Sequence, residues 1–132
     1  MGFGKKKPPP IRSLIGEGTV VRGNLSFNEG LRIDGEVIGD VTAAEEGHSI
    51  LVISENARVH GRVAASHVII NGEVRGPLVC SDMLELQPKA RVWGDVRYET
   101  LEMHPGAQVE GELKPLKSAD KPALKLAASN EV

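Results

Sequence analysis

Residue types that commonly carry chemistry are few and widely spaced in this chain. The histidines and the single cysteine are His48, His60, His67, Cys80 and His104. One cysteine cannot form an internal disulfide or a cysteine-based zinc site, and we interpret it as a small core residue. The histidines are too scattered to identify a catalyst, and no Gly-x-x-x-x-Gly-Lys loop is present to hold a phosphate. We therefore expect no catalytic residue, no cofactor, no nucleotide and no metal site.

Adjacent carboxylates are the other arrangement that could perform acid–base chemistry. Glu45 and Glu46 lie in the stretch 42–49, which interrupts an otherwise regular pattern. Neighbouring side chains on a loop rarely converge on one substrate, and nothing around them suggests a pocket that would shift a pKa. We expect a loop that leaves the fold, either a solvated acidic loop or a partner-binding site.

The elements that would position such residues come from a repeated pattern of 13 residues. It occurs at 51–63, 84–96 and 101–113 in one order: apolar, any, apolar, three turn residues, Ala, any, Val, any, Gly, any, apolar. Apolar residues at every second position predict strands with one buried face, and the turn residues predict a corner between two strands. One such unit cannot bury its own apolar face, whereas stacked units can.

The pattern extends over most of the chain. A degenerate copy begins at Ile15, and the units at 31–41 and 68–78 lack the corner insertion, with Gly35 and Gly72 in its place. Each unit has a glycine two residues before its last apolar position, where a bend is expected to be too tight for a Cβ. These glycines are Gly23, Gly39, Gly61, Gly76, Gly94 and Gly111. Their mean step of about 18 residues suits one coil of three short strands.

We therefore predict an all-β fold, a single-stranded parallel β-helix of about six coils. Right-handed coiling is the default for parallel crossovers, but the left-handed alternative stays open. With 15 glycines and only 3% aromatic residues, the core must consist of Val, Ile and Leu, and a broad enzyme pocket is hard to build from these. The enzyme alternative, a left-handed acyltransferase-like β-helix, needs an apolar residue every six positions, and no unit sustains that register.

Charge divides the chain into three parts. Residues 1–12 carry +4, residues 13–113 carry −8 and residues 114–132 carry +2. We predict a disordered basic, proline-rich tail, a β-helical core and a second disordered basic tail over these ranges. An acidic body does not suit nucleic acid, whose phosphates need a basic face. No apolar run approaches 18 residues, so we expect no membrane span and a cytoplasmic protein.

The first residues combine apolar side chains with a lysine cluster. Met1 and Phe3 could enter a membrane interface while Lys5, Lys6 and Lys7 meet anionic lipid. These five residues are the candidate membrane contacts. The alternative is a solvated terminus.

The two ends of the solenoid carry the main functional prediction. Solenoids usually hide their terminal coils under a cap, because an open coil exposes apolar core and unpaired backbone groups. We find no cap in this sequence and expect the coils to stack end to end into a filament. The candidate interface residues are Leu14, Ile15, Val21 and Leu25 at one end and Val109 and Leu113 at the other. The alternative is a monomeric adaptor whose tails fold back over the ends.

Two sets of outward positions could contact partners along the sides. Trp93 shares its place in the repeat with His60, and it is either a lateral contact or packed beneath a tail or loop. Arg58, Arg91 and Gln108 should form an outward stack that binds an acidic partner or pairs with neighbouring acids.

Several segments resemble the bactofilin family. They are Ser13 to Thr19 (SLIGEGT), Gly23 to Leu25 (GNL), Leu31 to Val41 (LRIDGEVIGDV) and the Ala-Arg-Val-x-Gly-x-Val units at 57–63 and 90–96. The resemblance covers residues 13–113 and does not include the tails. It implies a right-handed triangular β-helix that polymerises without nucleotide into non-polar filaments, often on the inner face of the bacterial cytoplasmic membrane.

The function implied by this resemblance is a cytoskeletal scaffold that is not an enzyme. The implied partners are further copies of the chain, an anionic membrane surface, and client proteins of the cell-wall or cell-shape machinery. Membrane binding in several members depends on a short N-terminal peptide with a hydrophobic residue near its start and nearby lysines. Met1, Phe3 and the lysines at 5–7 match that peptide in kind. We therefore expect a location peripheral to the cytoplasmic membrane.

Overall fold

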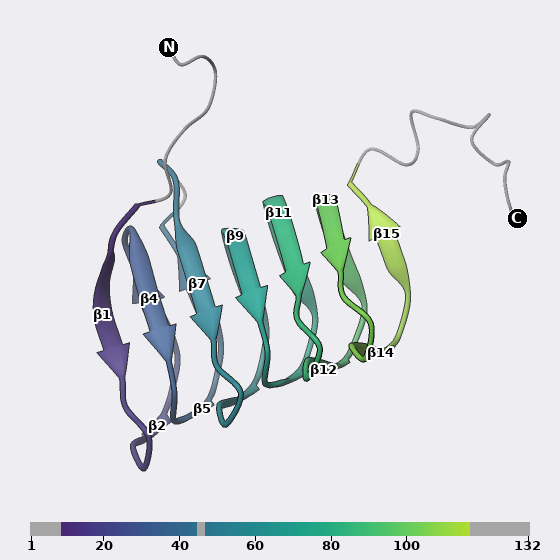
Figure 1. Cartoon of the computed structure of the whole chain (residues 1–132). Coiled ribbons are helices and arrows are strands. Elements are labelled where there is room, and N and C mark those ends of the chain that lie inside the picture. The colour runs from purple at the N-terminus through teal and green to yellow at the C-terminus, as the bar shows by residue number, and fades with distance from the viewer. Residues whose placement is uncertain (1–8, 45–46, 117–132) are drawn as a thin grey trace, which may run out of the picture.

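The fold is a right-handed β-solenoid of about six coils. The computed structural model describes residues 9–44 and 47–116, and these contain 15 strands and no helix. In Figure 1 the front strands run downward and the return strands rise behind them as the chain advances from left to right, which makes the coil right-handed. The predicted parallel β-helix is confirmed, because every strand pairs in parallel with its neighbours.

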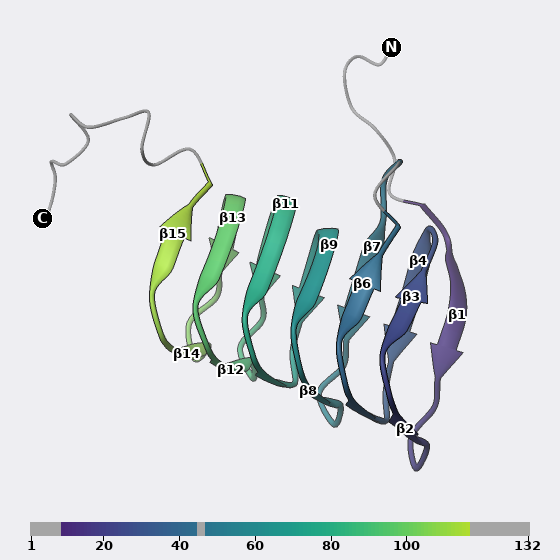
Figure 2. The same cartoon turned by 180° about the vertical axis from the view of Figure 1, so that it is seen from behind.

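Each coil contributes one strand to each of three faces. The first face consists of β1 (Ile11–Ile15), β4 (Gly30–Ile33), β7 (Ile50–Ile53) and the second halves of β9 (Val63–Ile70), β11 (Leu78–Leu86) and β13 (Val96–Met103). The second face consists of β2 (Val20–Arg22), β5 (Glu36–Ile38), β8 (Arg58–His60), β10 (Glu73–Arg75), β12 (Arg91–Trp93) and β14 (Gln108–Glu110). The third face consists of β3 (Leu25–Phe27), β6 (Val41–Ala43), the first halves of β9, β11 and β13, and β15 (Leu113–Pro115). Figure 2 shows the rising strands β3 and β6 of the third face from behind.

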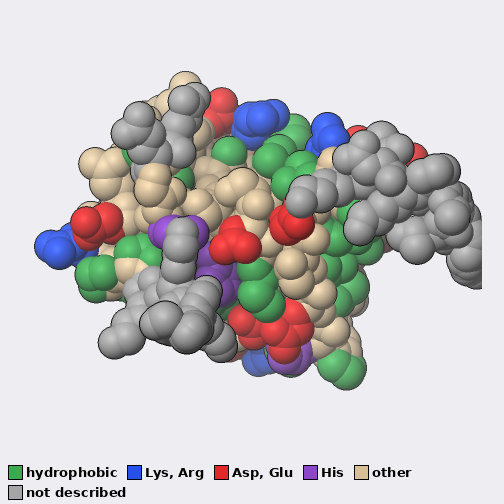
Figure 3. Space-filling view, turned by 90° about the horizontal axis from the view of Figure 1, so that it is seen from above, with side chains coloured by type: hydrophobic (Ala, Val, Ile, Leu, Met, Phe, Trp, Pro, Cys, Tyr) green, Lys and Arg blue, Asp and Glu red, His purple; other side chains and the backbone are tan. Residues whose placement is uncertain are grey.

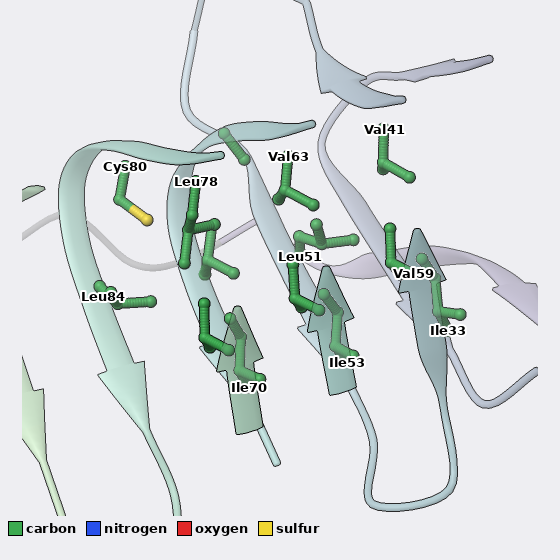
Figure 4. Packing of buried hydrophobic residues seen from close by; sticks show 14 of the residues in the cluster. Ile33, Val41, Leu51, Ile53, Val59, Val63, Ile70, Leu78, Cys80 and Leu84 are labelled. Carbon is green, nitrogen blue, oxygen red and sulfur yellow. The ribbon is translucent and has the colours of Figure 1, made fainter. Parts of the chain in front are cut away.

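The interior is built from columns of inward side chains, with one member from each coil. The second-face column is valine throughout: Val21, Val37, Val59, Val74, Val92 and Val109. A first-face column consists of Ile15, Ile33, Ile53, Ile70, Leu86 and Met103. Figure 4 shows Ile33, Ile53 and Ile70 on neighbouring strands, pointing into this core. Side chains of one shape, stacked at the strand spacing of about 4.8 Å, fill a narrow interior without large aromatic residues.

The predicted glycine bend has a specific cause at one corner of the triangle. The six glycines of this bend follow the second-face strands, and Gly76 has a φ of 150°. A Cβ on Gly76 would lie 2.1 Å from the carbonyl oxygen of Gly61, which occupies the same corner one coil earlier. The corner therefore excludes side chains because successive coils stack there backbone on backbone.

The two kinds of repeat unit produce two kinds of corner. The three-residue insertions form turns that project from the solenoid, as the loops between β1 and β2 and between β7 and β8 show in Figure 1. Gly35 and Gly72 form shorter corners, each stacked against the insertion of the preceding coil. A Cβ on Gly35 would lie 2.4 Å from the carbonyl oxygen of Gly16 in that insertion. The expectation that these two glycines replace the insertion is confirmed by this close approach.

The limits of the solenoid differ slightly from the sequence interpretation. β1 begins at Ile11, two residues before the expected boundary, and β15 continues through Pro115, beyond the expected end at residue 113. Thr42 and Ala43 belong to β6 and not to the loop, because the hydrogen-bonded ladder with β3 continues to Ala43. The greater part of both tails lies outside the described residues, so their predicted disorder stays a prediction.

The corner glycines yield a first prediction. Gly76→Ala should lower the free energy of unfolding by about 3 kcal/mol or more, because the added Cβ meets a backbone oxygen that cannot rotate away. The matched control is Gly16→Ala, where a Cβ would meet nothing within 4 Å and the cost should stay within about 0.5 kcal/mol. Urea unfolding followed by circular dichroism measures both, and equal midpoints for the two variants would contradict this account of the corner.

Candidate functional site

The candidate functional surfaces are the two ends of the solenoid, beginning with the end formed by the first coil. Its strands each pair on one side only, β1 with β4, β2 with β5 and β3 with β6. Within residues 9–44 and 47–116 the opposite edges of these strands have no β-partner. A parallel sheet edge with free N–H and C=O groups is a template for another chain.

The side chains of this first end continue the apolar columns of the core. Ile15, Val21 and Leu25, all predicted interface residues, are the first members of their columns and are half-buried against the core. Phe27 lies in the same surface and was missed, because it falls outside the repeat pattern. These four side chains form an apolar end face.

Leu14 is placed differently from the other candidates at this end. It is 61% exposed and points outward from β1, in register with Arg32 of the next coil. It therefore lies on the side of the first coil and not on the end face. Val20 and Ile38 are also exposed and outward, so apolar surface extends from the first end onto the sides of the first two coils.

The last coil forms an equivalent end. β14 pairs only with β12 and β15 only with β13, which leaves their outer edges without a β-partner among the described residues. The predicted residue Val109 is half-buried, and the predicted residue Leu113 is 38% exposed. Leu101 and Met103 join them and were missed, although they occupy the first two apolar positions of the third 13-residue repeat.

Exposure at both ends follows from the absence of a neighbouring coil. In the second-face column the four middle valines are at most 1% exposed, whereas Val21 and Val109 are half-buried. Large hydrophobic side chains that are exposed in the described part of the chain all belong to the first two coils or the last one. Figure 3 shows hydrophobic side chains gathered at the right-hand end, where the last coil lies. Stacking another coil on either end would bury this surface.

The second face explains the outward tryptophan. Trp93 is half-buried, and the guanidinium carbon of Arg75 on the neighbouring strand lies 4.0 Å from the centre of its ring. Neither of the two sequence interpretations, a lateral contact or packing under a tail, anticipated this cation–π pair. His60 occupies the equivalent outward position on β8, as predicted.

Arg75 also belongs to an ion-pair cluster with Glu73. The Glu73 carboxylate accepts hydrogen bonds from Arg75 Nε at 2.8 Å and from the His60 ring at 3.0 Å. Burial opposes ionisation of Glu73, but these hydrogen bonds and charges outweigh it and hold the pKa of Glu73 below its usual value. The predicted stack of Arg58, Arg91 and Gln108 lies outward in the same row as Glu73, so the two arginines flank a carboxylate.

Two further chemical candidates, Cys80 and the groove beside Ser54, contain no activated nucleophile. Cys80 is fully buried, and burial raises the pKa of its thiol to about 12, as expected for a core residue. A shallow groove of about 430 Å³ on the first face contains Ser54 and Asp34, and the hydrogen bond from Ser54 lowers the pKa of Asp34. The lining of this groove includes no histidine that could activate the serine hydroxyl.

Some predicted residues lie outside the described part of the structure. They are the membrane candidates Met1, Phe3, Lys5, Lys6 and Lys7, together with the loop carboxylates Glu45 and Glu46. No helix among residues 9–44 and 47–116 is long and apolar enough to cross a membrane.

Comparison with known proteins gives consistent matches over the solenoid. The profile of the bactofilin family, described as polymer-forming cytoskeletal, matches residues 13–114. Bactofilin BacO of Myxococcus xanthus is 31% identical over 111 residues, which cover 84% of this chain and 85% of that protein. Bactofilin BacP of the same organism is 26% identical over 101 residues, which cover 76% of this chain but only 40% of the relative. No solved structure matches the chain.

The Glu73 cluster predicts how stability depends on pH. Because the pKa of Glu73 is lowered by folding, the unfolded chain takes up this proton more readily, and stability should fall as the pH drops below about 4.5. Glu73→Gln should be less stable than wild type near pH 7 and should lose less stability than wild type on acidification. Urea midpoints between pH 7 and pH 3 test this, and parallel profiles for wild type and Glu73→Gln would exclude the assigned role.

Proposed function

Because this chain belongs to the bactofilin family of polymer-forming cytoskeletal proteins, we propose that it assembles end to end into filaments that act as a scaffold in the cell. The observation that carries this proposal is that both solenoid ends are apolar and that no strand among residues 9–44 and 47–116 covers them. Each end presents sheet edges from all three faces around half-buried core side chains. Joining two ends would continue the hydrogen bonding between strands from one chain to the next. It would also bury the apolar core side chains that are partly exposed in the terminal coils.

Assembly of this kind needs no nucleotide. The driving forces are apolar burial and backbone pairing, both of which are present in the folded chain, and the sequence has no phosphate-binding loop. We infer that the purified chain forms filaments in plain buffer.

The filaments are proposed to be non-polar, as the bactofilin resemblance implies. In a non-polar filament like ends meet, so first coils join first coils and last coils join last coils through two different isologous contacts. In a polar filament the last coil would instead join the first coil of the next copy. The two arrangements respond differently when only one end is damaged.

We further propose that the scaffold lies on the inner face of the cytoplasmic membrane and positions cell-wall or cell-shape machinery. Support for the membrane contact comes from the composition of residues 1–7, where two apolar side chains accompany three lysines. The chain enters the described structure at Pro9, beside the first coil, so a membrane-bound segment would hold that coil near the lipid surface.

Variants of the two ends test the assembly. Leu25→Lys damages the first end and Val109→Glu the last end, and both should stop filament growth because a charge would be buried at the joint without a partner. The control is Val52→Lys, which places a charge at an outward position in the middle of the body and should leave filaments intact. Negative-stain electron microscopy gives the assembly state, and circular dichroism confirms that each variant is folded.

The size of the arrested particle then distinguishes the two filament types. If like ends meet, each variant keeps one intact joint and should stop at two chains. If unlike ends meet, either variant should stop at single chains. Long filaments from both variants would show that the ends are wrongly assigned, and discrete wild-type particles under all conditions would favour the capped monomeric adaptor.

Removal of residues 1–7 tests the membrane contact separately. The truncated chain should still form filaments but should lose binding to anionic liposomes by about 100-fold, since each lysine contributes about 1 kcal/mol. Replacement of the three lysines by glutamine should have most of this effect, and raised salt should imitate it. Co-sedimentation with liposomes measures the change, and undiminished binding of the truncated chain would place the contact elsewhere.

A further inference from the structure

Two glutamates and a histidine converge on the first face next to the last coil. Glu85 on β11 and Glu102 on β13 are direct partners in the parallel register, and both point outward. His104 follows β13 immediately, and its backbone N–H donates to the carbonyl oxygen of Leu86 at 2.9 Å. The stacking of the fifth and sixth coils therefore brings together three side chains that are up to 19 residues apart.

Their donor atoms have the spacing of a metal site. His104 Nε2 lies 3.1 Å from a carboxylate oxygen of Glu85 and 3.7 Å from one of Glu102, and all three donor atoms lie within 4.8 Å of one another. Ligands about 2.0 to 2.1 Å from a tetrahedral zinc ion are separated by about 3.4 Å. Two of the three separations are already close to that value. The Glu102 side chain is about half exposed, so a small rotation of it would bring the third separation to the same value.

The charge of this cluster points to a cation as well. Three carboxylates elsewhere on the solenoid have a basic partner: Glu73 pairs with Arg75, Asp34 with Arg32 and Glu55 with Lys89. No lysine or arginine among the described residues forms a salt bridge with Glu85 or Glu102. Like charges directly opposite each other on neighbouring strands are destabilising, and one imidazole cannot balance two carboxylates. The Gln87 side chain contributes only an amide contact to Glu85, at 3.4 Å.

We propose that Glu85, Glu102 and His104 bind a divalent transition-metal ion of the zinc type. The imidazole nitrogen favours such an ion over calcium or magnesium, which prefer an all-oxygen set. One oxygen from each glutamate and His104 Nε2 supply three ligands, and solvent supplies the fourth because the cluster is partly exposed. The ion joins the sixth coil to the fifth and neutralises the glutamate pair.

A metal ion at this site would stabilise the last coil of the solenoid. Glu102 and His104 belong to the last coil, whose outer edge has no β-partner among the described residues. A terminal coil is the part of a solenoid that opens most easily, since it is held from one side only. A bound ion would hold the last coil closed and keep its apolar end face in place.

Equilibrium dialysis of the full chain against zinc ion alone tests the site, because it reports binding by filaments and single chains equally. Wild type should bind one ion per chain at this site, and Glu102→Gln and His104→Gln should each weaken that binding by at least about tenfold. The control is Glu110→Gln, which removes an outward carboxylate from the same coil on a different face and should bind as wild type. Zinc should also slow hydrogen exchange of the backbone amides of β13 in wild type but not in His104→Gln.

Two results would overturn the proposal. One is a wild-type chain that binds no zinc up to about 100 µM at neutral pH. The other is zinc binding that both cluster variants retain in full, which would assign the ion to other residues. Either result would leave the proposed filament function untouched, because assembly is measured separately on the end variants.

Discussion

Parallel hydrogen bonding of one coil on the next is the interaction on which this structure depends. It holds successive coils at the strand spacing of about 4.8 Å, so every position must suit the residue directly above and below it. The valine column of the second face and the glycine corner at Gly61 and Gly76 are two results of this rule. Apolar residues repeat where the stack faces inward, and side chains are excluded where backbone stacks on backbone.

The same rule creates the apolar ends on which the proposed assembly depends. A stack of coils has no intrinsic end, because the forces that add the fifth coil to the fourth would also add another coil to the last. Val109 and Leu113 are partly exposed because they are the last residues of their inward-facing columns and no further coil covers them among the described residues. The end-to-end assembly proposed above would therefore continue the stacking of coils from one chain to the next.

The sides of the solenoid show how outward residues meet the same constraint. Each outward side chain has neighbours one coil away, and some of these neighbours form favourable contacts, as in the contact of Glu73 with His60 and the contact of Arg75 with Trp93. Glu85 and Glu102 instead place two carboxylates directly opposite each other, and their convergence with His104 is the basis for proposing a metal ion there. Leu14 is a second unfavourable case, because this exposed leucine on the side of the first coil has an arginine, Arg32, as its neighbour in register.

The sequence by itself determined the coil, because a repeat with period-two apolar positions and a glycine at each corner can bury its apolar face only by stacking. It also identified Ile15, Val21, Leu25 and Val109 as members of the terminal coils, since their places in the repeat are readable without a structure. Tertiary structure alone decided the contacts between coils. The repeat already places Arg75 level with Trp93 and Glu85 level with Glu102. It does not specify the direction of each long outward side chain, which can adopt several rotamers, so only the tertiary structure shows Arg75 over the Trp93 ring and His104 beside Glu85.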